Sequence, residues 1–153
     1  MVDVSDKSPT QRTATAGARV EMHPKTFDLL RNVLLQNKPS AISKKGDVLT
    51  IAKLAGIMAA KQTSNLIPLC HPISLSVVDV QLALNEEDKA VDIRCTCRCM
   101  AATGVEMEAL TGATIAGLTV YDMCKAVDKE MRMTNVRLLA KSGGRSGDFR
   151  AQE

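Results

Sequence analysis

The sequence predicts an α+β domain in which helices cover one face of a four-stranded antiparallel sheet. Two observations lead to this prediction: strand-like segments alternate with segments of helical periodicity, and the connections between them are short. A length of 153 residues with 45% hydrophobic and 24% charged side chains suits one folded core. We therefore treat residues 1–153 as a single domain, with a flexible N-terminal arm over about 1–11 and a mobile C-terminal tail over about 142–153.

The first half of the chain predicts one strand and two helices. Thr, Ala and Val partly alternate from Arg12 to Met22, which favours a strand. Pro24 precedes an amphipathic stretch over residues 25–34, which favours a helix that begins at the proline. A second helix is expected to begin after Asp47, its N-cap, and to stop near Gln62.

The middle of the chain predicts an ordered loop followed by a hairpin. Residues Asn65–Pro72 contain two prolines, which cannot donate backbone hydrogen bonds, so this segment reads as an unusually apolar loop. Two strand-like runs follow, Ile73–Leu84 and Ala90–Met100. The polar connection 85–89 has a length that a hairpin tolerates, so the two strands are expected to be antiparallel neighbours.

The last third predicts a long helix and a short strand. The helix is expected from Val105 to about Met131, and its small residues, Gly112 and Gly117 among them, indicate close packing because glycine in a helix costs about 1 kcal/mol relative to alanine. A strand is expected over Asn135–Ala140. Residues 142–147 lack periodicity and a hydrophobic face, so we expect them to be mobile.

With the paired first helices counted as one, the order strand, helix, strand, strand, helix, strand is that of the ferredoxin-like arrangement. Its helices would cover one face of the sheet and leave the other bare. Apolar residues of the second strand alternate between the two faces: Ile73, Leu75 and Val77 against Val78, Val80, Leu82 and Leu84. We therefore expect another subunit to cover the bare face.

Composition narrows the classes of function. The net charge of +3 is mild, and no apolar run approaches the ~20 residues that cross a bilayer, so a cytoplasmic protein is expected. Five cysteines cannot all pair, which favours reduced thiols. Cys95, Cys97 and Cys99 alternate as on one face of a strand and lack the C-x2-C spacing that wraps zinc, so no metal site is expected.

The residues themselves indicate three candidate sites, and each of them also has a purely structural explanation. Asp122 and Lys125, three apart on a helix, share a face and could exchange a proton, although an exposed ion pair is the commoner outcome. Lys45 precedes a helix N-terminus, where an anion would be favoured, or it is a solvated lysine. His71, in the apolar loop, could transfer protons near neutral pH or could be structural.

Blocks over nearly the whole chain resemble the cyclic pyranopterin monophosphate synthase family, the molybdenum cofactor biosynthesis protein C (MoaC) family. The blocks occur in the order and spacing of the family, which is more specific than any single motif. They are Met1–Ser5, Lys45–Val48, Leu66–Pro72, Thr103–Leu110, Tyr121–Val127 and residues 138–149.

The resemblance implies a lyase that converts 3′,8-cyclo-7,8-dihydroguanosine 5′-triphosphate to cyclic pyranopterin monophosphate and diphosphate. It implies a ferredoxin-like subunit in a homohexamer, a trimer of dimers, with active sites at the dimer interface. No metal or redox cofactor is implied, and Mg²⁺ with the triphosphate is possible but not indicated. The expected partner is this small molecule, with neither nucleic acid nor membrane involved.

The matching positions imply roles for individual residues. Asp122 would be the catalytic acid–base residue and Lys125 and Lys45 its basic partners, and clustered ammonium groups would lower the pKa of one lysine. Which lysine is the base stays open. The expected substrate-binding residues are Leu69, Cys70, His71, Glu106, Met107, Glu108, Arg12 and Lys141.

Three other functions fit parts of the sequence. An RNA-binding ferredoxin-like domain would suit the pI of about 8.6, but the predicted strands lack stacking aromatics. A thiol-based metal carrier would use the alternating cysteines and would be purified with stoichiometric metal. A family member that only supports assembly would not need Lys45, Asp122 and Lys125, all of which are present.

Overall fold

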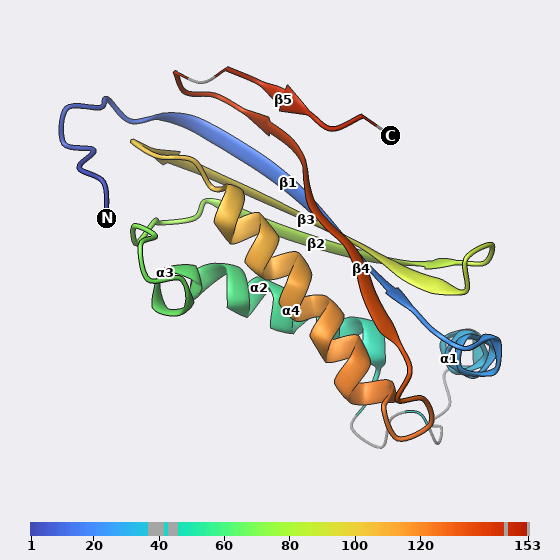
Figure 1. Cartoon of the computed structure of the whole chain (residues 1–153). Coiled ribbons are helices and arrows are strands. Elements are labelled where there is room, and N and C mark those ends of the chain that lie inside the picture. The colour runs from blue at the N-terminus through green and yellow to red at the C-terminus, as the bar shows by residue number, and fades with distance from the viewer. Residues whose placement is uncertain (37–41, 43–45, 146, 153) are drawn as a thin grey trace.

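The computed structural model describes the chain except for residues 37–41, 43–45, 146 and 153. It contains one twisted antiparallel sheet with helices packed against one face (Figure 1). The predicted α+β class is confirmed. The described residues form five strands rather than four: β1 Thr10–Glu21, β2 Val77–Asn85, β3 Ala90–Ala101, β4 Arg132–Ser142 and β5 Phe149–Arg150.

The strands lie in the order β2-β3-β1-β4-β5, and every neighbouring pair is antiparallel. The expected hairpin is present, with β2 and β3 paired from Val77 opposite Arg98 to Asn85 opposite Ala90. β1 is central and pairs along its length with both β3 and β4. The first strand of the sequence therefore supports both halves of the sheet.

The fifth strand lies in the segment predicted to be a mobile tail, where no strand was expected. Phe149 and Arg150 pair with Lys141 and Ala140 of β4, and the Ala151 amide donates to the Leu139 carbonyl at 2.8 Å. The chain can reverse before β5 because glycines in the intervening turn adopt positive φ, a conformation that few other residues tolerate. The glycine-rich composition thus encodes a turn, and Phe149 is an aromatic residue in a strand where none was expected.

The helices are α1 Pro24–Gln36, α2 Val48–Lys61, α3 Thr63–Leu66 and α4 Glu106–Cys124. Asp47 is the N-cap of α2, as predicted, and its Oδ1 accepts from the Thr50 amide at 2.6 Å. The short α3 lies partly in the segment expected to be a loop. α4 ends at Cys124 rather than near Met131, because the carboxylate of Asp128 accepts from backbone amides of the following turn and of the segment before α1.

β2 begins at Val77 rather than at Ile73, and this corrects the expected apolar character of the bare face. Ile73 and Leu75 precede the strand and pack, half-buried, against the core. On β2, the positions that face away from the helices include Asp79 and Gln81. The apolar residues before Val77 therefore belong to a loop that packs on the core. The open face of β2 itself carries polar side chains.

The core is a single layer between the sheet and helices α2 and α4. β1 contributes small residues such as Ala14 and Ala16, and β3 contributes Cys95, Cys97 and Cys99, all buried. Helices α2 and α4 cross where a Cβ added to Gly56 would lie 2.8 Å from the Gly112 carbonyl oxygen, so the expected close packing at Gly112 is confirmed.

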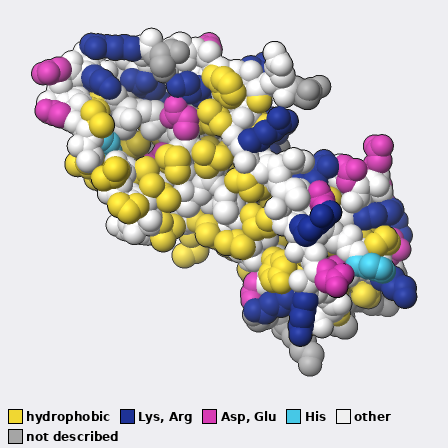
Figure 2. Space-filling view, in the orientation of Figure 1, with side chains coloured by type: hydrophobic (Ala, Val, Ile, Leu, Met, Phe, Trp, Pro, Cys, Tyr) yellow, Lys and Arg dark blue, Asp and Glu magenta, His cyan; other side chains and the backbone are white. Residues whose placement is uncertain are grey.

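The outer surface of the helical layer is rich in hydrophobic side chains. Figure 2 shows them gathered over the region that α2, α3 and α4 occupy in Figure 1. Ile51, Leu54 and Met58 recur along one face of α2, and each is exposed. Within the described residues, none of the helices combines the length and hydrophobicity that crossing a bilayer requires.

Candidate functional site

A pocket of about 280 Å³ lies where the segment after α3 meets the start of α4. The two segments are more than thirty residues apart in sequence, but the sheet brings them together by placing β2 next to β3. Six residues predicted to bind substrate are in this one pocket. Its lining is Leu69, Cys70, His71, Ile73, Thr103, Gly104, Glu106, Met107 and Glu108.

Glu108 is the buried carboxyl group of the pocket, with 4% of its surface exposed. Burial raises the pKa of Glu108, and the nearby charge of Glu106 adds to the effect. Burial also raises the pKa of the Cys70 thiol, and the charge of Glu108 acts in the same direction. The pocket thus holds a carboxyl group that keeps its proton more readily than an exposed glutamate does.

His71 is held by the N-terminal arm. Its Nε2 lies 2.8 Å from the backbone carbonyl oxygen of Val2. A carbonyl oxygen can only accept a hydrogen bond, so Nε2 carries the hydrogen. In the neutral ring, Nδ1 is then the nitrogen left to accept a proton or a hydrogen bond.

Glu106 and Lys141 meet beside the pocket, with 3.1 Å between Oε1 and Nζ. Lys141 is on β4, opposite Ala14 of β1, so this contact joins the start of α4 to the sheet. Gly104 allows the Glu106 carboxylate to fold back over it, because a Cβ at this position would collide with that carboxylate. Lys141 therefore borders the pocket through Glu106 and does not line it.

Arg12 is half-buried and connects two separate backbone segments through hydrogen bonds. Its guanidinium donates to the carbonyl oxygens of Ala101, Ala102 and Gly143 at 3.3 to 3.4 Å. Ala101 is the last residue of β3, Ala102 begins the connection to α4, and Gly143 follows β4. In this chain Arg12 therefore holds the backbone around the pocket.

Asp122 and Lys125 form an ion pair at the other end of α4, with 2.7 Å between Oδ1 and Nζ. Both side chains are about half exposed. The hydrogen bond and the charge of Asp122 raise the pKa of Lys125. This is opposite to the lowering expected from clustered ammonium groups, because the partner that the structure shows is a carboxylate.

The pocket and this ion pair are far apart within one chain. Fifteen residues of continuous helix separate Met107 from Asp122, and at 1.5 Å per residue they span about 22 Å. A single subunit therefore does not bring its own Asp122 to its own pocket. Lys45, the remaining predicted catalytic residue, lies outside the described residues.

Sequence reasoning missed the pocket role of Ile73, Thr103 and Gly104, and the contact of Val2 with His71. Thr103 and Gly104 stand directly before a helix, a position that can be found from sequence. Nothing in the sequence indicates that the N-terminal arm returns to His71.

The other cysteines do not line the pocket, although the charge of Glu108 reaches Cys99. Burial raises the pKa of Cys99, and it raises the pKa of Cys124 to about 12. Cys95, Cys97 and Cys99 face the core beneath α4. Among the residues that the structure describes, no three His, Cys, Asp or Glu side chains are grouped so that they could hold a metal ion.

Comparison with known proteins gives a consistent result. Residues 1–144 match the model of the MoaC family. A relative from Rhodospirillum rubrum is 55% identical over 151 residues, which cover 99% of this chain and 86% of the relative. Relatives from Chloroflexus aurantiacus and Heliobacterium modesticaldum are 53% and 50% identical, over 97% and 100% of this chain and 86% and 91% of their own lengths. All three are named cyclic pyranopterin monophosphate synthase.

Proposed function

This chain belongs to the MoaC family, and on that basis we propose how it works as a cyclic pyranopterin monophosphate synthase. It is an enzyme of molybdenum cofactor biosynthesis. Its reaction converts 3′,8-cyclo-7,8-dihydroguanosine 5′-triphosphate to cyclic pyranopterin monophosphate and diphosphate. The new phosphate ester forms when a sugar hydroxyl attacks the α-phosphorus and the bond to the diphosphate breaks. The cytoplasm is the proposed location.

The pocket beside the start of α4 is the proposed site for the guanine-derived ring. Glu108 can accept the N–H donors of such a ring, and Nδ1 of His71 can accept another hydrogen. Leu69 and Met107 supply apolar contact. The buried carboxyl of Glu108 is the single observation that carries this assignment, because burial without a substrate leaves it costly to ionise.

Asp122 is the proposed acid–base residue, with Lys125 and Lys45 as its basic partners. Rebuilding a purine-derived ring into a pterin needs proton transfers, and a carboxylate in contact with an ammonium group can exchange protons with a bound substrate. Lys141 and Arg12 are the proposed contacts for the phosphates, because both place positive charge at the edge of the pocket.

We propose that two subunits build each active site. The separation of about 22 Å between Met107 and Asp122 supports this, because a second copy could place its Asp122 beside the pocket of the first. The exposed apolar face of α2 supports association as well. The proposed assembly is a homohexamer arranged as a trimer of dimers.

The proposed subunit fold is ferredoxin-like. The four longer strands lie in the order β2-β3-β1-β4, and two helical segments cover one face, as the split β-α-β arrangement requires. β5 extends this sheet at the β4 edge.

The activity is tested by incubating the purified protein with enzymatically prepared 3′,8-cyclo-7,8-dihydroguanosine triphosphate. Diphosphate release and pterin fluorescence after oxidation are followed for the wild type and for Asp122→Ala and Lys125→Ala. Product from the wild type alone supports the reaction and both residues. A folded wild type that makes no product contradicts the synthase function and favours a subunit that serves only in assembly.

A further inference from the structure

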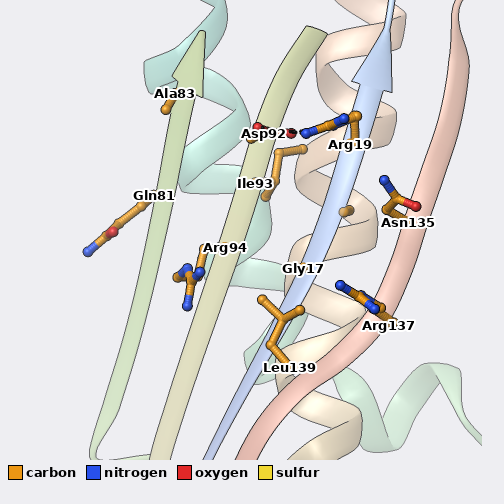
Figure 3. Close-up of a pocket in the computed structure, with 11 residues that line it drawn as sticks. Gly17, Arg19, Gln81, Ala83, Asp92, Ile93, Arg94, Asn135, Arg137 and Leu139 are labelled. Atoms are coloured by element: carbon orange, nitrogen blue, oxygen red, sulfur yellow. Dashed lines mark hydrogen bonds and ion pairs between the residues drawn. The ribbon is translucent and has the colours of Figure 1, made fainter. Parts of the chain in front are cut away.

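On the face of the sheet that the helices leave open, Gly17 of β1 lies between two arginines. The register places Arg94 of β3 on one side of Gly17 and Arg137 of β4 on the other. Gln81 of β2 continues this row beside Arg94. Because neighbouring strands are about 4.8 Å apart, the Cα atoms of the two arginines are about 10 Å apart. Figure 3 shows both side chains on the same side of the sheet.

A cavity of about 410 Å³ lies over this row. Its floor between the arginines is apolar, because the Leu139 side chain packs over Gly17, where a Cβ would lie 3.1 Å from Leu139 Cδ1. Polar groups line its sides, including Gln81 and Asn135 (Figure 3). Arginine nitrogens and amide groups thus surround an empty space wide enough for a small ligand.

Two carboxylates lie at the cavity, and both accept hydrogen bonds from residues that line it. Asp92 lines the cavity and accepts from Arg19 Nε at 2.6 Å and from Asn85 Nδ2 at 2.9 Å, and Arg19 also pairs with Asp88. Asp79 accepts from Gln81 Nε2 at 2.8 Å.

Arg94 and Arg137, the two arginines of the row, differ from Arg19, which forms ion pairs with carboxylates. Within the described part of the chain, no carboxylate pairs with Arg94 or Arg137, and Arg137 Nη1 donates only to the Gln152 carbonyl oxygen at 3.3 Å. The row therefore carries two positive charges that no acidic side chain of the described residues neutralises.

The shape of β4 is irregular on both sides of Arg137. The pairing of β1 with β4 shifts register between Thr15 and Ala16 and again between Gly17 and Arg19. Asn135 has a φ of 54°, in the left-handed region that non-glycine residues seldom adopt. Bulges of this kind bend a strand and change the direction of its side chains, and they are common beside binding sites.

We propose that Arg94 and Arg137 form a binding site for a phosphate group on the open face of the sheet. Guanidinium groups bind phosphate oxygens through paired N–H donors, and two of them facing one cavity suit a doubly charged oxyanion. The site is distinct from the pocket at α4, which lies on the helical side of the sheet. It does not depend on the synthase reaction.

The experiment is a calorimetric titration of inorganic phosphate, and separately of diphosphate, into the full-length protein at low ionic strength. The variants are Arg94→Gln and Arg137→Gln. Arg98→Gln is the matched control, because Arg98 is an exposed arginine on the same strand and face but lies outside the row. Size-exclusion chromatography of all four proteins is run alongside.

The expected result is phosphate binding by the wild type and by Arg98→Gln, and binding weaker by roughly tenfold or more in each row variant. Synthase activity without added phosphate should stay unchanged in both row variants. The proposal is overturned if all four proteins bind phosphate equally, or if none does. It is also overturned if the row variants change the oligomeric state, because the row would then be a subunit contact.

Discussion

Glu106 in the first turn of α4 forms an ion pair with Lys141 of β4, with 3.1 Å between the two charged atoms. The side chains are 31% and 22% exposed, so water screens the pair only in part. The contact holds the start of the helix, and with it the pocket, against the strand that leads to β5. It also keeps a positive charge at the edge of the pocket.

Replacing Lys141 tests that charge. Lys141→Met should raise KM for the triphosphate substrate by about tenfold, because a charged contact to phosphate is lost. The free energy of unfolding should fall by no more than about 1 kcal/mol, as for partly exposed ion pairs. Steady-state kinetics and urea unfolding measure the two effects. Lys25→Met on α1 is the control and should change neither; an unchanged KM in Lys141→Met would remove Lys141 from the substrate site.

The raised pKa of Glu108 determines how the stability of the folded protein changes with pH. The folded protein binds the Glu108 proton more tightly than the unfolded chain does, so ionised Glu108 lowers the free energy of unfolding at neutral pH. This loss of stability disappears as the pH falls to about 4.5, the pKa of glutamate in the unfolded chain. Glu108→Gln should therefore be more stable than the wild type at pH 7 and equally stable near pH 4. Thermal unfolding across this range measures it. Glu87→Gln, in the exposed turn between β2 and β3, should show no such trend, and the same trend in both variants would contradict the account.

Asp122 should control the proton affinity of Lys125. In Asp122→Asn the carboxylate charge is lost, so the pKa of Lys125 should fall toward its ordinary value. NMR titration of the side-chain nitrogen of Lys125 detects this shift. Turnover should drop by roughly a hundredfold or more if Asp122 is the acid–base residue. An unchanged titration of Lys125 would show that the ion pair is absent in solution.

The crossing of α2 and α4 should not tolerate a larger residue at Gly112. An added Cβ would lie 2.6 Å from Cys95 Sγ and 3.1 Å from the Gly56 carbonyl oxygen, so Gly112→Ala should destabilise the protein by about 1 to 3 kcal/mol in spite of its better helix propensity. Gly117→Ala is the matched control on the same helix, because its Cβ would meet the flexible end of Met133. Urea unfolding should show the control near or above wild-type stability. Equal losses in both would contradict the packing argument.

Local signals in the sequence predicted much of the fold. Asp47 marked the start of α2, and the polar turn after Asn85 marked the hairpin, because both signals lie within a few residues of the feature they set. β5 was missed because it is only two residues long and follows a glycine-rich segment that was interpreted as mobile. The extent of β2 was misjudged because Ile73 and Leu75 are apolar for a loop that covers the core.

The sequence predicted which residues belong to the candidate site, but not how those residues are arranged. The resemblance selected six residues that share one pocket, from Leu69 to Glu108. The predicted continuous helix already implied that Asp122 lies about 22 Å from Met107, but the resemblance placed both residues in one site without saying that they must come from different subunits. The contact of His71 with Val2 was equally hidden, since no local pattern connects residues so far apart in the chain.

The shared active site is tested most directly by mixing two inactive variants, Glu108→Gln and Asp122→Asn. Each alters one half of the proposed site, and each should be folded and inactive alone. After subunit exchange at equal ratio, verified by native mass spectrometry, half of the dimers are mixed and each contains one intact site. The account predicts a return to about a quarter of wild-type activity. A mixture no more active than its components would show that each site belongs to a single subunit and would contradict the account.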